Sequence, residues 1–368
     1  MFVQVLLSYF KSIWSRKKYI LLASSLFAII VCLINANQIF GCIAENFRVF
    51  GGYSGTYTNA CDKTSAACTS SCSKPLSSSP QQRLLEILSS ANLTLTRQES
   101  ENVLSMAKSI PESDVIIVSA SSSNHYDAMQ AMFYNIHTVV FPLVHNLTVV
   151  LFDIGLTEEE RTKTEKYCKC TVVTFPSEKF HPHLKKNFCY SWKPIIVRAT
   201  IEKAKKLLIY QDSSVRWTKK IVNVMKRAST VGLQLFRYPT VARIPVHTLK
   251  QTFDYFGELP CAFDPFPELS AAVGIYRNDI GNIRALLEPW AKCALVSECM
   301  CPVDPDLVIN CIKPVAYHRC HRFDQSALGI LTAKLFNTDI LRVISPDPGP
   351  GALVQYDDFM PNYFNTIV

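Results

Sequence analysis

Short apolar runs alternate with helix-patterned stretches between residues 114 and 212, and this alternation constrains the fold more than any other feature. The apolar runs are "DVIIVSA", "LTVVLFD", "CTVVTFP" and "KLLIYQD", and each has the length of a buried strand. One helical pattern between them begins with Thr157 as a predicted N-cap ahead of three glutamates. The alternation predicts an α/β domain with a mostly parallel sheet flanked by helices, which binds ligands at the carboxyl ends of its strands.

The fourth apolar run ends in polar residues, in the sequence "LLIYQDSSVRW" at 207–217. We therefore expect Asp212, Ser214 and Arg216 to lie where a sheet of this class binds its ligand. The alternative is structural: Asp212 caps a turn and pairs with Arg216 at the surface.

Three motifs together resemble one superfamily. The sequences "IYQDSSVRW", "YSWKPIIVRA" and "HRFDQSALGIL" are similar to those of the GT-A nucleotide-diphospho-sugar transferases. More closely, residues 114–337 resemble a nematode-rich family of uncharacterised type II membrane proteins. The resemblance implies a GT-A-like, Rossmann-like domain that transfers a sugar from a nucleotide-diphosphate donor to a glycan or glycoprotein. The alternative is a catalytically inactive protein of this fold that binds a glycan or a partner protein.

The resemblance also implies a donor site. In the superfamily an Asp-x-Asp motif holds Mn²⁺ or Mg²⁺ against the donor phosphates. Asp212 matches the first acid of that motif, but Ser214 stands where the second would be, and a hydroxyl is a weaker ligand than a carboxylate. A retained metal would need a further ligand beside Asp212, for which His321 is a candidate. Without a metal, Asp212 would bind ribose or sugar hydroxyls, and Arg216 or a nearby lysine would supply the positive charge on the diphosphate.

Two of these residues have further interpretations. Lys193 lies at a predicted helix start, where amide groups and an ammonium could bind phosphate, although an ordinary solvated lysine fits as well. Asp324 resembles the Asp of an Asp-Gln pair in such transferases and is our candidate base, although it could equally be a helix N-cap. Asp264 and Glu268 are alternative bases.

The N-terminal region predicts a membrane anchor. Residues 19–40 carry no charge over roughly the length that crosses a bilayer, and a basic flank precedes them. A cleaved signal peptide is the alternative. The basic flank favours a cytoplasmic N-terminus and hence a single-pass type II protein of the Golgi or endoplasmic reticulum, with its main domain in the lumen.

The chain is accordingly divided into five segments. These are a cytoplasmic tail (1–18), the transmembrane anchor (19–40), a Ser/Thr/Cys-rich stem with short helices (41–110), the GT-A-like domain (111–345) and a C-terminal tail (346–368).

Cysteines and sequons also fit an oxidising, glycosylating compartment. Asn92 and Asn146 lie in Asn-x-Thr sequons, and 14 cysteines occur in the chain. Twelve of them follow the anchor and its edge, an even set that predicts disulfides. A zinc site is the alternative for the cluster Cys299, Cys301, Cys311, His318, Cys320 and His321.

The net charge of +8 includes four positive charges in the N-terminal flank, so the rest of the chain is only mildly basic. It has no basic stripe interleaved with aromatic residues, which argues against a nucleic-acid partner. The hydrolase, zinc-protease and P-loop motifs are also missing from the sequence.

Overall fold

The computed structural model describes residues 72–185, 189–237, 242–301, 311, 320–345, 353–355 and 362–367. Its strands are β1 (Ser113–Ser121), β2 (Leu147–Asp153), β3 (Thr171–Thr174), β4 (Ala204–Gln211), β5 (Val215–Trp217), β6 (Leu233–Arg237), β7 (Leu269–Arg277), β8 (Ile344–Ser345) and β9 (Leu353–Gln355). Its α-helices are α3 (Pro80–Leu88), α4 (Arg97–Ser105), α5 (Tyr126–Asn135), α6 (Glu158–Tyr167), α7 (Trp192–Thr200), α8 (Ile221–Val231), α9 (Lys250–Tyr255), α10 (Ile280–Asn282), α11 (Glu288–Ala294), α12 (Ser297–Met300), α13 (Asp324–Phe336) and α15 (Tyr363–Thr366).

Seven strands form one sheet in the order β3-β2-β1-β4-β7-β6-β8. The first four pair in parallel, whereas β7 runs antiparallel between β4 and β6. The predicted α/β fold with a mostly parallel sheet is confirmed. The strand order reverses direction between β1 and β4, which is the switch point where open α/β sheets bind ligands.

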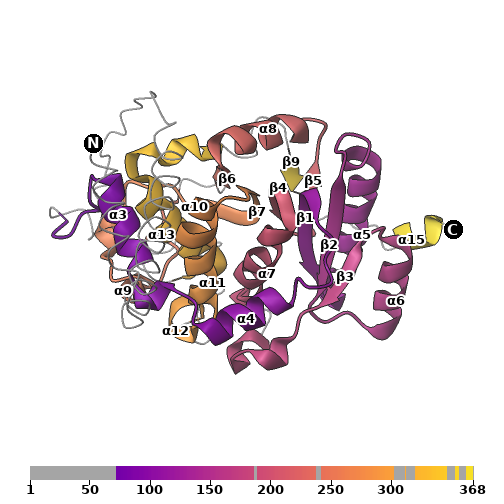
Figure 1. Cartoon of the computed structure of the whole chain (residues 1–368), viewed down its shortest axis with the longest axis horizontal. Coiled ribbons are helices and arrows are strands. Elements are labelled where there is room, and N and C mark those ends of the chain that lie inside the picture. The colour runs from indigo at the N-terminus through magenta and orange to yellow at the C-terminus, as the bar shows by residue number, and fades with distance from the viewer. Residues whose placement is uncertain are drawn as a thin grey trace, which may run out of the picture. The chain divides into compact units, whose positions relative to one another are not determined.

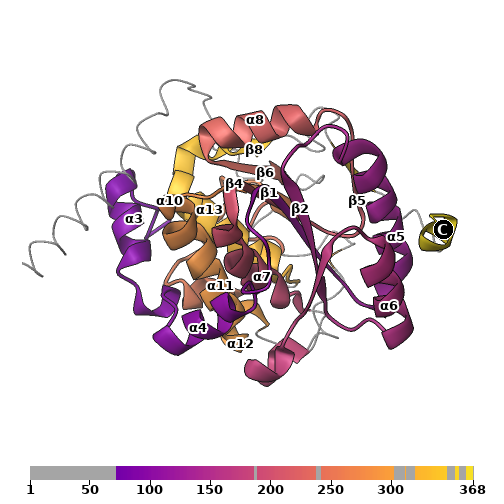
Figure 2. The ribbon, with the colours of Figure 1, turned by 45° about the vertical axis from the view of Figure 1, so that its right-hand side comes forward.

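Helices cover both faces of the sheet. On β1, Val115 and Ile117 point into a core formed with α5, and the alternate residues Ile116 and Val118 are buried as well. Figures 1 and 2 show α5 and α6 on one side of the sheet and α4, α7 and α11 on the other. Because both faces are covered, these strands have nearly continuous apolar sequences instead of alternating ones.

The short helices before the sheet pack on the domain. The Arg83 guanidinium of α3 donates to the main-chain carbonyls of Lys334 and Leu335 at the end of α13. The carboxylate of Glu99 in α4 pairs with Lys292 of α11 at 2.7 Å, and Cys72, which precedes both helices in the sequence, forms a disulfide with Cys261. The later part of the segment assigned to a stem, residues 79–110, therefore contacts the second half of the domain.

The C-terminal helix α15 packs beside α5. Phe364 is fully buried, with its ring centroid 5.8 Å from that of Phe133, and its main-chain N–H donates to the Gln130 side chain at 3.1 Å. Part of the predicted C-terminal tail thus contributes to the core of the sheet's first half.

The predicted anchor at 19–40 lies outside the described residues. Within the part of the chain that the structure describes, none of the helices is both long enough and apolar enough to span a bilayer.

Five disulfides join described cysteines. The pairs are Cys72–Cys261, Cys168–Cys170, Cys189–Cys301, Cys293–Cys299 and Cys311–Cys320. The zinc alternative fails because all four cysteines of that cluster are in disulfides, and its His318 lies outside the described residues. Cys61 and Cys68 lie outside them too.

Candidate active site

Three residues flagged in the sequence meet at the carboxyl end of β4. Lys193 comes from the first turn of α7, Asp212 follows β4 directly, and Asp324 is the first residue of α13. The Lys193 ammonium lies 3.2 Å from Asp212 Oδ1 and 2.9 Å from Asp324 Oδ2. It also donates to the Ala271 carbonyl at 3.1 Å. We call Lys193, Asp212 and Asp324 the charged cluster.

Burial differs sharply within the charged cluster. The side chains of Lys193 and Asp324 are 4% and 5% exposed, whereas that of Asp212 is 30% exposed. Asp212 is therefore the member of the charged cluster that a ligand can reach most directly, whereas Lys193 and Asp324 are buried.

The electrostatics keep Lys193 charged and bring the pKa of Asp324 closer to neutral pH. Burial opposes the charged form of Lys193, but the carboxylates of Asp212 and Asp324 outweigh it, and the pKa of Lys193 is raised. For Asp324, burial dominates over the opposing ammonium and raises the pKa of this carboxyl to about 6. A carboxyl group with such a pKa can take up or release a proton near neutral pH.

Aromatic residues surround the ammonium. The Lys193 Nζ atom lies 5.3, 6.0 and 5.1 Å from the ring centroids of Tyr190, Trp192 and Tyr210, within the range of cation–π attraction. The Tyr210 hydroxyl also donates to Asp212, and burial raises the pKa of this tyrosine well above its usual value. Tyr210 therefore stays protonated and helps to fix the Asp212 carboxylate.

The backbone is strained on both sides of the charged cluster. Tyr190, three residues before Lys193, has φ 53°, and Phe323, directly before Asp324, has φ 47°. Large aromatic residues rarely adopt this region, and such strain concentrates at functional sites. The two rings lie 6.3 Å apart by centroid, and Tyr190 is 43% exposed. Because Phe323 is the N-cap of α13, Asp324 is not the N-cap of its helix.

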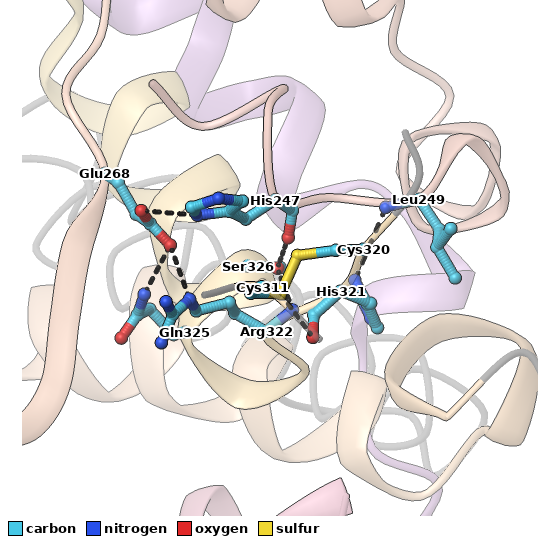
Figure 3. The surroundings of a disulfide bond; sticks show 9 residues. All are labelled: His247, Leu249, Glu268, Cys311, Cys320, His321, Arg322, Gln325 and Ser326. Carbon is cyan, nitrogen blue, oxygen red and sulfur yellow. Dashed lines mark hydrogen bonds and ion pairs between the residues drawn. A yellow bond between two sulfur atoms is a disulfide. The ribbon is translucent and has the colours of Figure 1, made fainter. Parts of the chain in front are cut away.

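A second network lies next to Asp324 in the sequence, around Gln325 of α13, and Figure 3 shows its members Gln325, Glu268 and His247. The Gln325 amide donates to Glu268 Oε1 at 2.6 Å, and Glu268 Oε2 contacts His247 Nδ1 at 2.8 Å. Gln325 also accepts from the main-chain N–H of Ala271, whose carbonyl contacts Lys193. Glu268, an alternative base in the sequence, is thus buried and engaged in holding the start of α13.

The donor residues proposed from the sequence separate in the structure. The Arg216 guanidinium is buried and donates to the main-chain carbonyls of Ser213, Val215 and Ala128. Ser214 lies partly buried in the turn between β4 and β5. Asp212 pairs with Lys193 and Tyr210, not with Arg216 as the structural alternative supposed.

Asp212 and His321, the metal ligands suggested from the sequence, do not form a metal site. Both nitrogens of buried His321 lie 3.4 Å from local partners, the Leu249 N–H and the Thr252 hydroxyl, and burial lowers the pKa of this histidine to about 3. Among the described residues, groups of three or more His, Cys, Asp or Glu that could hold a metal are absent. The carboxylates of the charged cluster already face an ammonium, so the residues present do not fit a divalent ion there.

Other polar features lie away from these contacts. A cavity of about 300 Å³ lies at the carboxyl ends of β2 and β3, lined by residues that include Asp153, Thr174 and Lys185. The sequon residues Asn92 and Asn146 are both exposed. Asp264 is buried.

Comparisons with known proteins give one partial family match and several solved structures. A family model described as "Protein of unknown function (DUF1647)" matches residues 81–198. The curated proteins contain no match.

The similar solved structures are glycosyltransferases. An active-site mutant of LgtC is 12% identical, with 66% of this chain and 87% of that chain covered and a TM-score of 0.38. Mouse xyloside xylosyltransferase 1 is 12% identical (64% and 84% covered, TM-score 0.34), and core-mannan synthase A from Aspergillus fumigatus in an Mn/GDP form is 9% identical (67% and 75%, TM-score 0.36). With every one of these scores below 0.5, a function for this chain has to be inferred from its own residues.

Proposed function

We propose that this chain transfers a sugar from a nucleotide-diphosphate donor to a hydroxyl of a glycan or glycoprotein. One observation carries the proposal: Lys193, Asp212 and Asp324, from three separate segments, form a charged cluster at the sheet's switch point. The resemblance of the three motifs that contain these residues to nucleotide-diphospho-sugar transferases supports it.

Asp324 is the proposed base. The acceptor oxygen forms a bond to the anomeric carbon while the bond from that carbon to the diphosphate oxygen breaks. The bonding pair leaves with the nucleoside diphosphate, and the proton of the acceptor hydroxyl moves to the Asp324 carboxylate. A pKa of about 6 suits this role, because the group is ionised at neutral pH and still basic enough to accept a proton.

Asp212 is the proposed donor contact. Its side chain is the most exposed of the charged cluster, and Lys193 and Tyr210 fix its orientation. A carboxylate held in this way accepts hydrogen bonds from the hydroxyls of a ribose or a sugar. Fixing the carboxylate before the donor binds reduces the ordering that binding requires.

Replacement of Asp212 tests the proposal. Asp212→Asn keeps the shape of the side chain but removes its charge, and we expect transfer by the purified full-length chain to fall at least about 100-fold. The matched control is Asp254→Asn, which removes an exposed carboxylate paired with Lys250 and should leave transfer unchanged. Transfer by Asp212→Asn at the rate of the unsubstituted chain would refute the assignment.

A second candidate function is recognition without transfer. The observation that favours it is the ion pair of Asp212 with Lys193, which engages the more exposed of the two carboxylates in the charged cluster. Such a protein would bind a glycan or a partner protein and would neither hydrolyse nor transfer any sugar nucleotide. A radiolabelled donor incubated with the chain separates the two functions, because only the enzyme releases free or transferred sugar.

We also propose that the domain faces the lumen of the Golgi or endoplasmic reticulum. The exposed sequons and the disulfides support this location. In microsomes from cells that express the full chain, the domain should resist added protease until detergent is present. It should also lose mass on treatment with an N-glycosidase, in a manner that depends on Asn92 and Asn146.

A further inference from the structure

We infer that the Lys193 ammonium takes the place of a divalent cation in the charged cluster, so that this chain binds its donor without a metal ion. The inference deepens the proposed function, on which its role in transfer rests. The exclusion of the metal from this site can be tested separately.

The ammonium is surrounded as a bound cation would be. Asp212, Asp324 and the carbonyl of Ala271 supply three oxygen-bearing groups around Lys193 Nζ, at 3.2, 2.9 and 3.1 Å. A lysine ammonium has three N–H donors, so its bonding capacity matches these neighbours. The same oxygens are of the kind that Mg²⁺ or Mn²⁺ prefers, so the ammonium and a metal ion would compete for one place.

Charge decides that competition in favour of Lys193. The lysine is held at the amino end of α7, its side chain is 4% exposed, and its raised pKa keeps the ammonium charged. A divalent ion brought to the same carboxylates would meet a fixed positive charge in a poorly solvated place, and like charges repel strongly there. The rings of Tyr190, Trp192 and Tyr210 lie within 6.0 Å of the ammonium and limit its movement away.

The turn after β4 carries fewer acidic residues than a site for a divalent metal ion would need. Ser214 stands two residues after Asp212, where a second acid would add a negative charge for a metal. The second carboxylate around the ammonium comes instead from Asp324, on a different element. The site therefore sets one positive group against two carboxylates, one of which has its pKa raised to about 6, and keeps a smaller net negative charge than the carboxylates alone would have.

This arrangement has a consequence for an anionic donor. A diphosphate approaching two bare carboxylates would be repelled by them. With Lys193 between the two carboxylates, one of their two negative charges is offset before the donor arrives. The ammonium thus supplies from within the protein part of the positive charge that a metal ion would supply, and it lowers the repulsion that an anion meets beside Asp212.

Manganese binding tests the inference without any assay of transfer. Mn²⁺ is titrated into the full-length chain, into Asp212→Asn and into Lys193→Ala, and free Mn²⁺ is measured by electron paramagnetic resonance. We expect the unsubstituted chain and Asp212→Asn to bind the same amount of Mn²⁺, since the unsubstituted chain holds none at Asp212. We expect Lys193→Ala, in which both carboxylates are released, to gain one site per chain, and the double variant Lys193→Ala/Asp212→Asn to lose it.

The unsubstituted chain alone can overturn the inference, even if Lys193→Ala fails to fold. One Mn²⁺ bound per chain and lost on Asp212→Asn would show that a metal shares the site with Lys193. A second measurement uses thermal shift with nucleoside diphosphates in EDTA or in Mn²⁺. Equal shifts in the two buffers support the inference, and a shift that requires Mn²⁺ contradicts it. If no nucleotide shifts the chain in either buffer, the proposed function fails while the manganese titration still decides the inference.

Discussion

Lys193 contributes to stability as well as to the site, because its removal leaves the buried Asp324 carboxyl and the partly exposed Asp212 carboxylate without their shared cation. We expect Lys193→Met, which keeps the length but not the charge, to lower the free energy of unfolding by about 3 kcal/mol. The control is Lys206→Met, since Lys206 is 68% exposed in its pair with Asp114 and should change stability by less than about 1 kcal/mol. Urea unfolding measures both, and equal losses would contradict the buried role of Lys193.

The pKa of Asp324 predicts the acid side of the pH profile. Burial raises this pKa to about 6, so the carboxyl is protonated below that pH and ionised above it. A base must be ionised, and kcat/KM should therefore fall about tenfold per pH unit below about pH 6. Asp324→Asn should lower kcat/KM and remove this dependence. If the same acid limb persists in Asp324→Asn, another group is the base.

The residues of the charged cluster could be found in the sequence, but their contacts could not. Asp212 stands out in the sequence because it directly follows a predicted strand. Lys193 and Asp324 stand out because each lies at the start of a predicted helix. The sequence suggested Lys193 as a phosphate ligand, and the structure places its ammonium between carboxylates. Arg216 looked equally suitable for a donor, but its buried guanidinium donates to main-chain carbonyls of Ser213 and Ala128. Long-range packing decides these partners, and a single sequence does not contain that information directly.

At the scale of elements, the Cys72–Cys261 disulfide links the chain ahead of α3 to the second half of the domain across 189 residues. Cross-linking so long a loop restricts the unfolded chain strongly, so Cys72→Ala/Cys261→Ala should lower stability by about 3 to 5 kcal/mol. The matched control is Cys168→Ala/Cys170→Ala, whose disulfide spans only 2 residues and should account for about 1 to 2 kcal/mol. Urea unfolding midpoints measured without reductant show which variant loses more stability. A larger loss of stability in the Cys168→Ala/Cys170→Ala control would contradict the prediction.

The first half of the sheet was predictable because its signal is local. The alternation up to β4 gives parallel strands with their carboxyl ends together, and β1, β2, β3 and β4 follow it. The direction of β7 was not predictable, since it depends on pairing with β4 across a long irregular segment. The surface on which α3 and α4 pack could not be predicted either, because a helical pattern in a polar segment does not indicate which part of the domain the helix covers.

At the scale of the whole molecule, ligand binding should raise the melting temperature of the native chain. A nucleoside diphosphate or its sugar ester, at a hundredfold excess over its Kd, should stabilise the fold by about 2.7 kcal/mol. Asp212→Asn should weaken the shift, and Asp254→Asn should not. A shift by one nucleotide class identifies the donor class, whereas silence across a panel of sugar nucleotides favours recognition without transfer.

The position of Asp324 on the late helix α13 also matters while the chain is being made. β4 and Lys193 leave the ribosome early, but β7, the antiparallel neighbour of β4, follows only at Leu269–Arg277, and Asp324 is later still. At translation rates of about 5 to 20 residues per second, the 131 residues from Lys193 to Asp324 take about 7 to 26 s. For that time the nascent chain holds a lysine without its second carboxylate, and for the earlier part of it, until Leu269–Arg277 has been made, β4 also has one edge unpaired. A chaperone that shields this edge would therefore act on the ribosome-bound chain, before the active site exists.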